Sequence, residues 1–401
     1  MPGILVAATG VGAGDLATAS LTGSQLGVAV LWAVVVGGFL KFTLTEGLAR
    51  WQLVTGQTFI EGVAHHFKYS VVWFFLPYML LWSFFVASAL MSSCGITLHA
   101  IIPIFNNAAY AKIFFGIFCG LAGLGLVLSG GFQLFEKVMG VCIGVMFITV
   151  VVTALLLWPG TTEVISGLFI PSIPDAQGLG ITWTVALIGG VGGTLTILCY
   201  GYWIREKGRE GTEAIKISRI DLAAGYSMTI LFGVAMVIIG STIKIEGSGA
   251  GLLVALADSL EKPLGSWGRW LFLIGAFSAV FSSLLGVWQA VPYLFADIWN
   301  LFVKRTDKSS TGDITKSKPY CIYLLALVFI PMLGLFINFK DIQKLYAVIG
   351  ALFIPLMAIG LLILNGRRTW VGGHINRPLT ITVLLATLVF FVLMAWMKWA
   401  G

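Results

Sequence analysis

Long apolar runs separated by short polar segments dominate the chain. A helix needs about 20 apolar residues to cross the hydrocarbon core of a bilayer. Runs of about this length occupy residues 3–20, 24–47, 71–101, 111–129, 134–158, 181–204, 221–243, 268–298, 320–338, 342–364 and 378–399. These runs lack the alternating pattern of a membrane β-barrel, so their backbone hydrogen bonds must be made within helices. The pattern predicts an all-α integral membrane protein with about eleven transmembrane helices.

Composition strengthens this prediction. The chain has 401 residues, of which 58% are hydrophobic and only 10% are charged. Soluble domains carry about 25% charged residues, so a soluble fold is excluded and we expect one polytopic transmembrane domain over residues 1–401. The 24 basic residues form no stripe that would bind nucleic acid. The predicted partners are the lipid bilayer and a small ion or small-molecule substrate, and the oligomeric state stays open.

The distribution of lysine and arginine predicts the orientation. One set of alternate loops holds 16 of these residues and the other set holds 7, with Lys41 inside a span. Positive residues are retained on the cytoplasmic side. We therefore expect the N-terminus in the cytoplasm and the C-terminus outside, in a protein of the plasma (inner) membrane.

Two spans carry clustered glycines. The first span contains TGVGAGDLAT at 9–18, and the sixth contains LIGGVGGTLT at 187–196. Breaks in a membrane helix are tolerated where the freed backbone is buried in protein or lines a watery cavity. The two clusters lie five spans apart. Because five is an odd number, two equal units of five helices have opposite orientations in the membrane. The pattern predicts an inverted repeat, with repeat one at about 3–158, repeat two at about 181–364 and an extra helix at about 378–399.

In proteins built from inverted repeats, matched broken helices form a substrate site near the middle of the membrane. Asp15 follows the first break directly, and a carboxylate inside a span usually marks an ion path or a proton site. Asp15 is therefore the best candidate for a metal ligand, although it could simply cap the second half of the helix. The glycines could instead allow close helix packing. The predicted substrate- or ion-binding residues are Gly12, Asp15, Thr18, Gly192, Thr194 and Thr196.

Other polar residues inside or beside the spans give weaker signals. Glu46 and Arg50 have the spacing of an ion pair on one helix face, with a structural or gating role. We expect Lys41, one turn deeper, to share Glu46 or to extend toward the interface. His65 and His66 are expected in a loop. The hydroxyls at Ser278, Ser282 and Ser283 could line a pathway or join helices. Since no nucleophile–base pair or cofactor motif occurs at usable spacing, we predict neither an enzyme nor a cofactor.

Three segments together resemble a known family. GDLAT at 14–18, LWAVVV at 31–36 and LARWQLVTGQTFIEG at 48–62 look like the opening of NRAMP transporters. The run with Arg50, Thr55 and Gly56 is the most specific of these, and FSS at 281–283 extends the similarity. The resemblance implies a LeuT-like fold with a 5+5 inverted repeat and discontinuous helices 1 and 6. It also implies proton-coupled import of manganese or iron.

The chain departs from the family where the metal ligands lie. The first-helix signature of the family is Asp-Pro-Gly-Asn, and here Gly12 replaces the Asp and Asp15 replaces the Asn. The sixth-helix signature Met-Pro-His corresponds to residues 192–194, Gly-Gly-Thr. Thioether sulfur favours softer transition metals, whereas oxygen-only sites suit magnesium, calcium, sodium or a proton. These replacements predict a hard divalent or monovalent ion and weak manganese binding.

Three functions remain open from the sequence. The leading hypothesis is a secondary cation transporter that works by alternating access, with proton coupling unresolved. The alternative is a transporter of a small organic solute such as an amino or organic acid, whose carboxylate could bind at the N-termini of half-helices. The third is a non-transporting receptor or scaffold with the same fold.

Overall fold

The computed structural model describes residues 2–67, 69–175, 179–242, 251–303 and 314–400, and over these ranges it contains helices and no strand. The first half comprises α1 (Pro2–Gly10), α2 (Ala13–Leu26), α3 (Leu31–Thr55), α4 (Phe59–Phe67), α5 (Tyr69–Ile101), α6 (Ala108–Leu156), α7 (Thr161–Phe169) and α8 (Gly180–Gly190). The second half comprises α9 (Cys199–Glu206), α10 (Ala214–Ser241), α11 (Gly251–Val303), α12 (Lys318–Phe329), α13 (Phe339–Ala351), α14 (Phe353–Leu364), α15 (Arg368–Val371) and α16 (Pro378–Ala400). The short 3-10 helices are η1 (Gly27–Val30), η2 (Leu195–Leu198), η3 (Ile314–Lys316) and η4 (Ile330–Phe336).

The helical runs agree with the predicted spans. Nine stretches among the described residues are long and apolar enough to cross a membrane. The first of them, Leu16–Thr55, joins the end of the first predicted span to the second, because η1 continues α2 into α3. The last predicted span corresponds to α16, of which Pro378–Leu393 forms a shorter apolar helix. The difference between the eleven predicted spans and the nine long apolar stretches therefore arises at the broken first span and at the last helix.

Two long helices contain sharp bends. In α6 the bend lies at Gly131, between the predicted spans 111–129 and 134–158, and in α11 it lies at Gly265, just before the predicted span 268–298. The prediction that His65 and His66 lie in a loop was wrong, because both belong to α4. This helix is short and amphipathic, so a search for long apolar runs passes over it.

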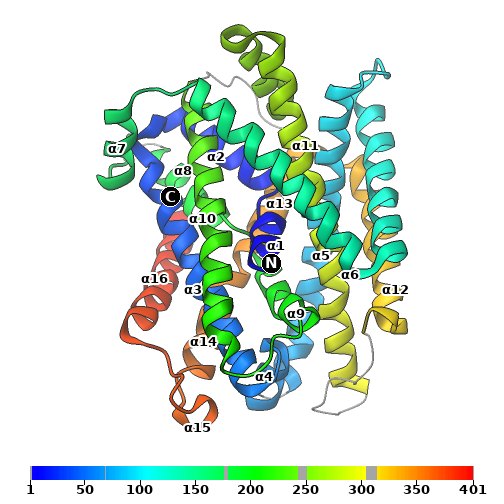
Figure 1. Ribbon diagram of the computed structural model, residues 1–401, viewed down its shortest axis with the longest axis vertical. Helices are drawn as coiled ribbons and strands as arrows, with labels where there is room; N and C mark the ends of the chain where they lie inside the picture. Colours follow the sequence, from blue (N-terminus) through cyan, green and yellow to red (C-terminus); the bar gives the residue numbers. More distant parts are fainter. Residues whose placement is uncertain (1, 68, 176–178, 243–250, 304–313, 401) are drawn as a thin grey trace.

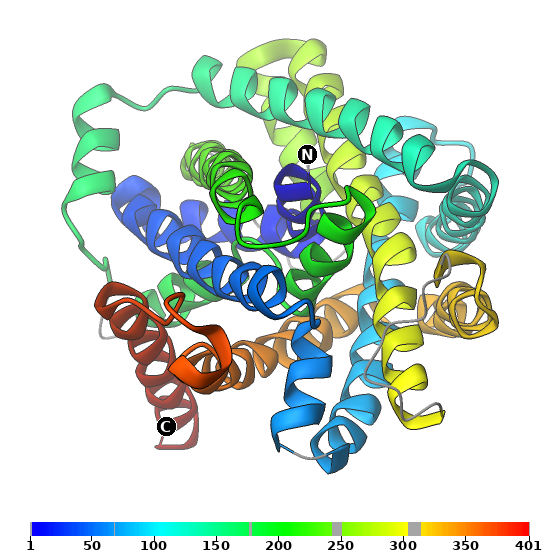
Figure 2. The same ribbon diagram turned by 60° about the horizontal axis from the view of Figure 1, so that its bottom comes forward.

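The broken helices lie inside the bundle. Figure 1 shows α1 at the centre, with α10 and α3 on one side and α5, α6 and α11 on the other. In Figure 2 α1 and α9 are surrounded by longer helices, while α16 lies at the periphery. The packing around α1 is close. A β-carbon on Gly3 would lie 2.2 Å from the carbonyl oxygen of Asp221, and one on Gly225 would lie 2.1 Å from that of Gly3. Small residues thus let α1 and α10 touch through their backbones, which is how helices associate in lipid.

Candidate functional site

The first break separates α1 from α2 at Val11 and Gly12. Ser283 of α11 lies beside it, and its buried hydroxyl is 2.8 Å from the carbonyl oxygen of Thr9, 3.1 Å from that of Val11 and 3.3 Å from that of Ala8. A hydroxyl has only one proton to donate. Its single proton is therefore shared among the carbonyls at and just after the end of α1.

The second break separates α8 from η2 and α9. Gly192 and Gly193 have φ values of +84° and +82°, a left-handed conformation that glycine adopts without steric cost. A β-carbon on Gly193 would lie 2.5 Å from Thr196 Oγ1 and 3.0 Å from Gly10 Cα. Both the turn of the chain and the space around it therefore require glycine here.

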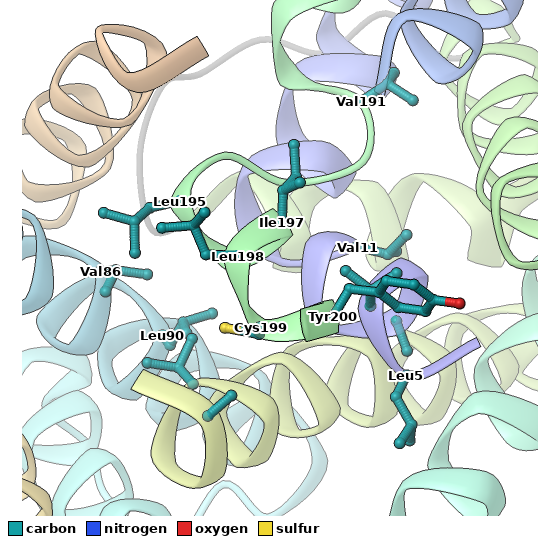
Figure 3. Packing of buried hydrophobic residues seen from close by; sticks show 14 of the residues in the cluster. Leu5, Val11, Val86, Leu90, Val191, Leu195, Ile197, Leu198, Cys199 and Tyr200 are labelled. Carbon is teal, nitrogen blue, oxygen red and sulfur yellow. The ribbon is translucent and has the colours of Figure 1, made fainter. Parts of the chain in front are cut away.

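The two breaks lie against each other. A β-carbon on Gly10, the last residue of α1, would lie 2.7 Å from the carbonyl carbon of Gly192 and 2.8 Å from the nitrogen of Gly193. Figure 3 shows the apolar surroundings, where Val11 faces the segment that contains Ile197 and Tyr200. Segments more than 170 residues apart in the chain thus bring their irregular backbones together inside the bundle.

Two threonine hydroxyls beside the second break have no hydrogen-bond partner among the described residues. Thr194 and Thr196 are 9% and 4% exposed, and neither Oγ1 atom is paired there. Thr194 also faces α13, since a β-carbon on Gly350 would lie 2.8 Å from its Oγ1. Leaving a buried hydroxyl unsatisfied costs about 1–3 kcal/mol. Such oxygens are suited to a hydrogen-bonding ligand or a hard cation.

Lys41 of α3 brings a buried positive charge to the second break. It is 1% exposed, and its Nζ donates to the carbonyl oxygens of Gly193 at 2.5 Å and Gly189 at 3.1 Å. The expectation that Lys41 extends toward the interface was wrong, because the second break offers carbonyl acceptors close by. A lone lysine within an apolar run was the available signal, but the sequence did not indicate a partner 150 or so residues away.

The remaining predicted site residues, Gly12, Thr18 and Asp15, lie at the first break or in α2. Gly12 lies at the first break, where a β-carbon would be 3.0 Å from Ser283 Oγ. Thr18 is half-buried further along α2, and its carbonyl accepts from Thr22 Oγ1 at 2.7 Å. Asp15 belongs to α2, but its side chain lies outside the described residues. Within the described part of the chain no group of three or more His, Cys, Asp or Glu side chains could hold a metal.

Glu46 and Arg50 form an ion pair on α3, with Arg50 Nε 3.3 Å from Glu46 Oε1. Arg219 of α10 joins the same carboxylate at 2.7 Å. Arg50 also donates to the carbonyl oxygen of His374 at 2.7 Å and to Asn376 Oδ1 at 2.8 Å. The pair therefore links α3 to α10 and to the segment before α16. It lies further along α3 than Lys41.

A polar cluster that the sequence did not reveal surrounds Asp297 of α11. This buried carboxylate accepts from Thr58 Oγ1 at 2.7 Å and from Tyr202 OH at 2.9 Å. Next to it, Glu61 accepts from the backbone nitrogen of Thr58 at 2.5 Å and pairs with Arg205 at 3.1 Å. The Thr58 and Glu61 contacts form a capping box at the start of α4. That local motif was visible in the sequence, whereas its connection to α9 and α11 was not.

The chain is similar in sequence to a known family of proteins. The family model described as natural resistance-associated macrophage protein-like matches residues 3–400. The divalent metal cation transporter MntH of Verminephrobacter eiseniae is 22% identical over 392 residues, which cover 94% of this chain and 83% of the relative.

Solved structures show the same fold. A mutant of the Eremococcus coleocola manganese transporter is similar with a TM-score of 0.78 at 16% identity, covering 99% of this chain and 85% of that one. MhsT in complex with L-phenylalanine is similar with a TM-score of 0.65 at 14% identity, covering 97% of both chains. The predicted all-α, LeuT-like membrane fold is confirmed. From the match over nearly its whole length, we conclude that this chain belongs to the natural resistance-associated macrophage protein-like (NRAMP) family of membrane transporters.

Proposed function

We propose that this protein is an NRAMP-family secondary transporter that carries a cation by alternating access around the two adjoining helix breaks. The observation that carries the proposal is the contact of Gly10 with Gly192 and Gly193. This contact places the irregular backbone of both broken helices at one point inside the bundle. The names of similar proteins, a divalent metal cation transporter and a manganese transporter, support metal ion transport as the class of activity.

The proposed cargo is a hard divalent or monovalent cation. Residues 192–194 supply carbonyls and one hydroxyl and contain no sulfur, and oxygen ligands favour ions such as magnesium or calcium over softer transition metals. The proposed substrate- or ion-binding residues remain Gly12, Asp15, Thr18, Gly192, Thr194 and Thr196. Asp15 acts as the cation ligand or as the acceptor of a coupled proton.

The repeats at about 3–158 and 181–364 are the proposed moving units, and the protein resides in the plasma membrane. The ion pair of Glu46 and Arg50 is a proposed gating contact. Because Glu46 also pairs with Arg219 of α10, separating α3 from α10 requires the contact between Glu46 and Arg219 to break.

Ion uptake by proteoliposomes tests the proposal. We expect wild-type protein to accumulate magnesium or calcium, with manganese uptake weaker, and Asp15→Asn to abolish uptake while the purified variant stays folded. Asp258→Asn is the matched control, because Asp258 is an exposed residue paired with Arg269 at 2.8 Å. Uptake of manganese in preference to magnesium and calcium would contradict the proposed cargo. Unchanged uptake by Asp15→Asn would contradict the role of Asp15.

A second candidate is transport of a small organic acid. It is favoured by the ammonium group of Lys41 at the second break, which would attract a carboxylate. A thermal-shift screen separates the candidates. Stabilisation by amino or organic acids and not by metal ions would favour the organic solute, whereas the reverse would favour a cation.

A further inference from the structure

We propose that the ammonium group of Lys41 is a built-in cation that occupies the carbonyl oxygens of the second break, so that a cargo cation binds there only by displacing it. The inference rests on the proposed function, since it concerns the same site. It assigns to Lys41 the role of determining which cations bind and how tightly.

The position of Nζ is that of a bound cation. It contacts the carbonyl oxygens of Gly193 and Gly189 at 2.5 Å and 3.1 Å. Gly189 lies in the last turn of α8, which ends at Gly190. The last four carbonyls of a helix have no partner within the helix, and they form the negative end of its dipole. A positive charge at this point is therefore stabilised whether it is a metal ion or an ammonium group.

The stem of Lys41 is fixed in place. A β-carbon on Gly192 would lie 3.4 Å from Cγ and 3.5 Å from Cβ of Lys41, so the glycine backbone packs directly on the side chain. With 1% of the residue exposed, the side chain does not reach the interface as flexible lysines near helix ends do. Lys41 is thus held at the break by contacts along its length.

The adjoining oxygens are those proposed to bind the cargo. Thr194 and Thr196 lie within three residues of the Gly193 carbonyl, and their hydroxyls are unpaired among the residues that the structure describes. A second cation placed there would lie close to the ammonium group, and like charges at short range in a medium of low dielectric constant repel strongly. Binding of a cargo cation at these oxygens therefore requires the Lys41 ammonium to leave the carbonyls.

Replacement of Lys41 tests the proposal in purified protein. Lys41→Met has a similar length and no charge. We expect its thermal midpoint to fall in ion-free buffer, because the two carbonyls lose their cation. Added magnesium, calcium or sodium should restore it. By calorimetry we expect at least one of these ions to bind the variant about tenfold or more tightly than wild type, which corresponds to about 1.4 kcal/mol.

Three further variants test whether a gain in ion binding comes from the loss of the Lys41 charge. Lys41→Gln retains N–H donors without the charge, so it should show the same gain and is the variant measured if Lys41→Met does not fold. Lys41→Arg retains the charge and should show no gain. Lys216→Met removes an exposed lysine of α10 and should also show none.

Two outcomes would overturn the proposal. One is that neither neutral variant binds any of the three ions more tightly than wild type. The other is that Lys216→Met gains as much as they do. These experiments measure binding by variants in detergent. The proposed function fails instead on the absence of cation uptake by wild-type proteoliposomes, so the two failures are distinguishable.

Discussion

Ser283 and Gly193 hold the two breaks in shape by different means. Ser283 supplies a hydroxyl to carbonyls that the interruption between α1 and α2 leaves without helical partners. Gly193 supplies a left-handed backbone and the space for Gly10. Both roles depend on single atoms, so single substitutions test them.

Replacing Ser283 with alanine should destabilise the protein. The change removes the donor 2.8 Å from the Thr9 carbonyl oxygen, and a buried acceptor left unpaired costs about 1–3 kcal/mol. Thermal unfolding in detergent measures the effect. Ser282→Ala is the matched control, because the Ser282 hydroxyl donates within its own helix to Ala279. Equal losses in the two variants would contradict a specific role of Ser283 at the break.

Gly193→Ala should damage the site more than Gly189→Ala. At Gly193 the left-handed conformation costs a residue with a β-carbon about 1–2 kcal/mol, and that carbon would lie 2.5 Å from Thr196 Oγ1. A β-carbon on Gly189 would meet no atom within 4 Å. We therefore expect a lower thermal midpoint and loss of uptake in Gly193→Ala alone. If Gly193→Ala is as stable as Gly189→Ala and keeps its uptake, the break does not require glycine.

At the scale of the helix, α1 is held at both ends. Its last residue packs on the second break. At its start, the nitrogen of Gly3 donates to Asp221 Oδ2 of α10 at 3.0 Å, and Arg209 pairs with the same oxygen at 2.7 Å. A short half-helix cannot be stable by itself, so these contacts help to hold α1 in place.

Asp221→Ala should loosen α1. The loss of a hydrogen bond to a charged group, worth about 1.5–3 kcal/mol, should raise amide hydrogen exchange across Pro2–Gly10 roughly tenfold or more. Mass spectrometry of peptides from α1 measures this rate. Glu213→Gln, an exposed residue just before α10, should leave the rate unchanged. No increase in Asp221→Ala would mean that the contact with Asp221 does not limit the opening of α1.

At the scale of the whole molecule, α4, α9 and α11 are joined through Asp297. Its contacts with Thr58 and Tyr202 link the segment before α4 to α9 and α11. Figure 2 shows α9 close to α1 inside the bundle. Movement of α9 relative to α11 therefore has to change this buried cluster. The Glu46 and Arg50 contacts instead join α3 to α10 and to the segment before α16.

The charge distribution predicts how the whole molecule lies in the membrane. Because 16 of the 24 basic residues fall in one set of loops, the N-terminus should be cytoplasmic and the C-terminus outside. Fusion of alkaline phosphatase, which is active only outside the cytoplasm, to the C-terminus should give activity. A fusion that ends in the 207–213 connection should give none. The opposite pattern would contradict the predicted orientation.

The sequence alone predicted most of the fold, because the length of an apolar run and the positions of glycines are local properties. These established the membrane helices, both breaks and the family resemblance. Even the Glu46–Arg50 pair was visible, since its partners lie one helical turn apart.

Only the tertiary structure decided which distant groups meet. Lys41 finds carbonyls in α8 and in the break after it, Ser283 reaches the end of α1, and Asp297 accepts hydrogen bonds from two other segments. In an apolar bundle a polar side chain must find a partner within the protein. The helix packing determines which partner that is, and a periodic pattern in the sequence does not reveal it.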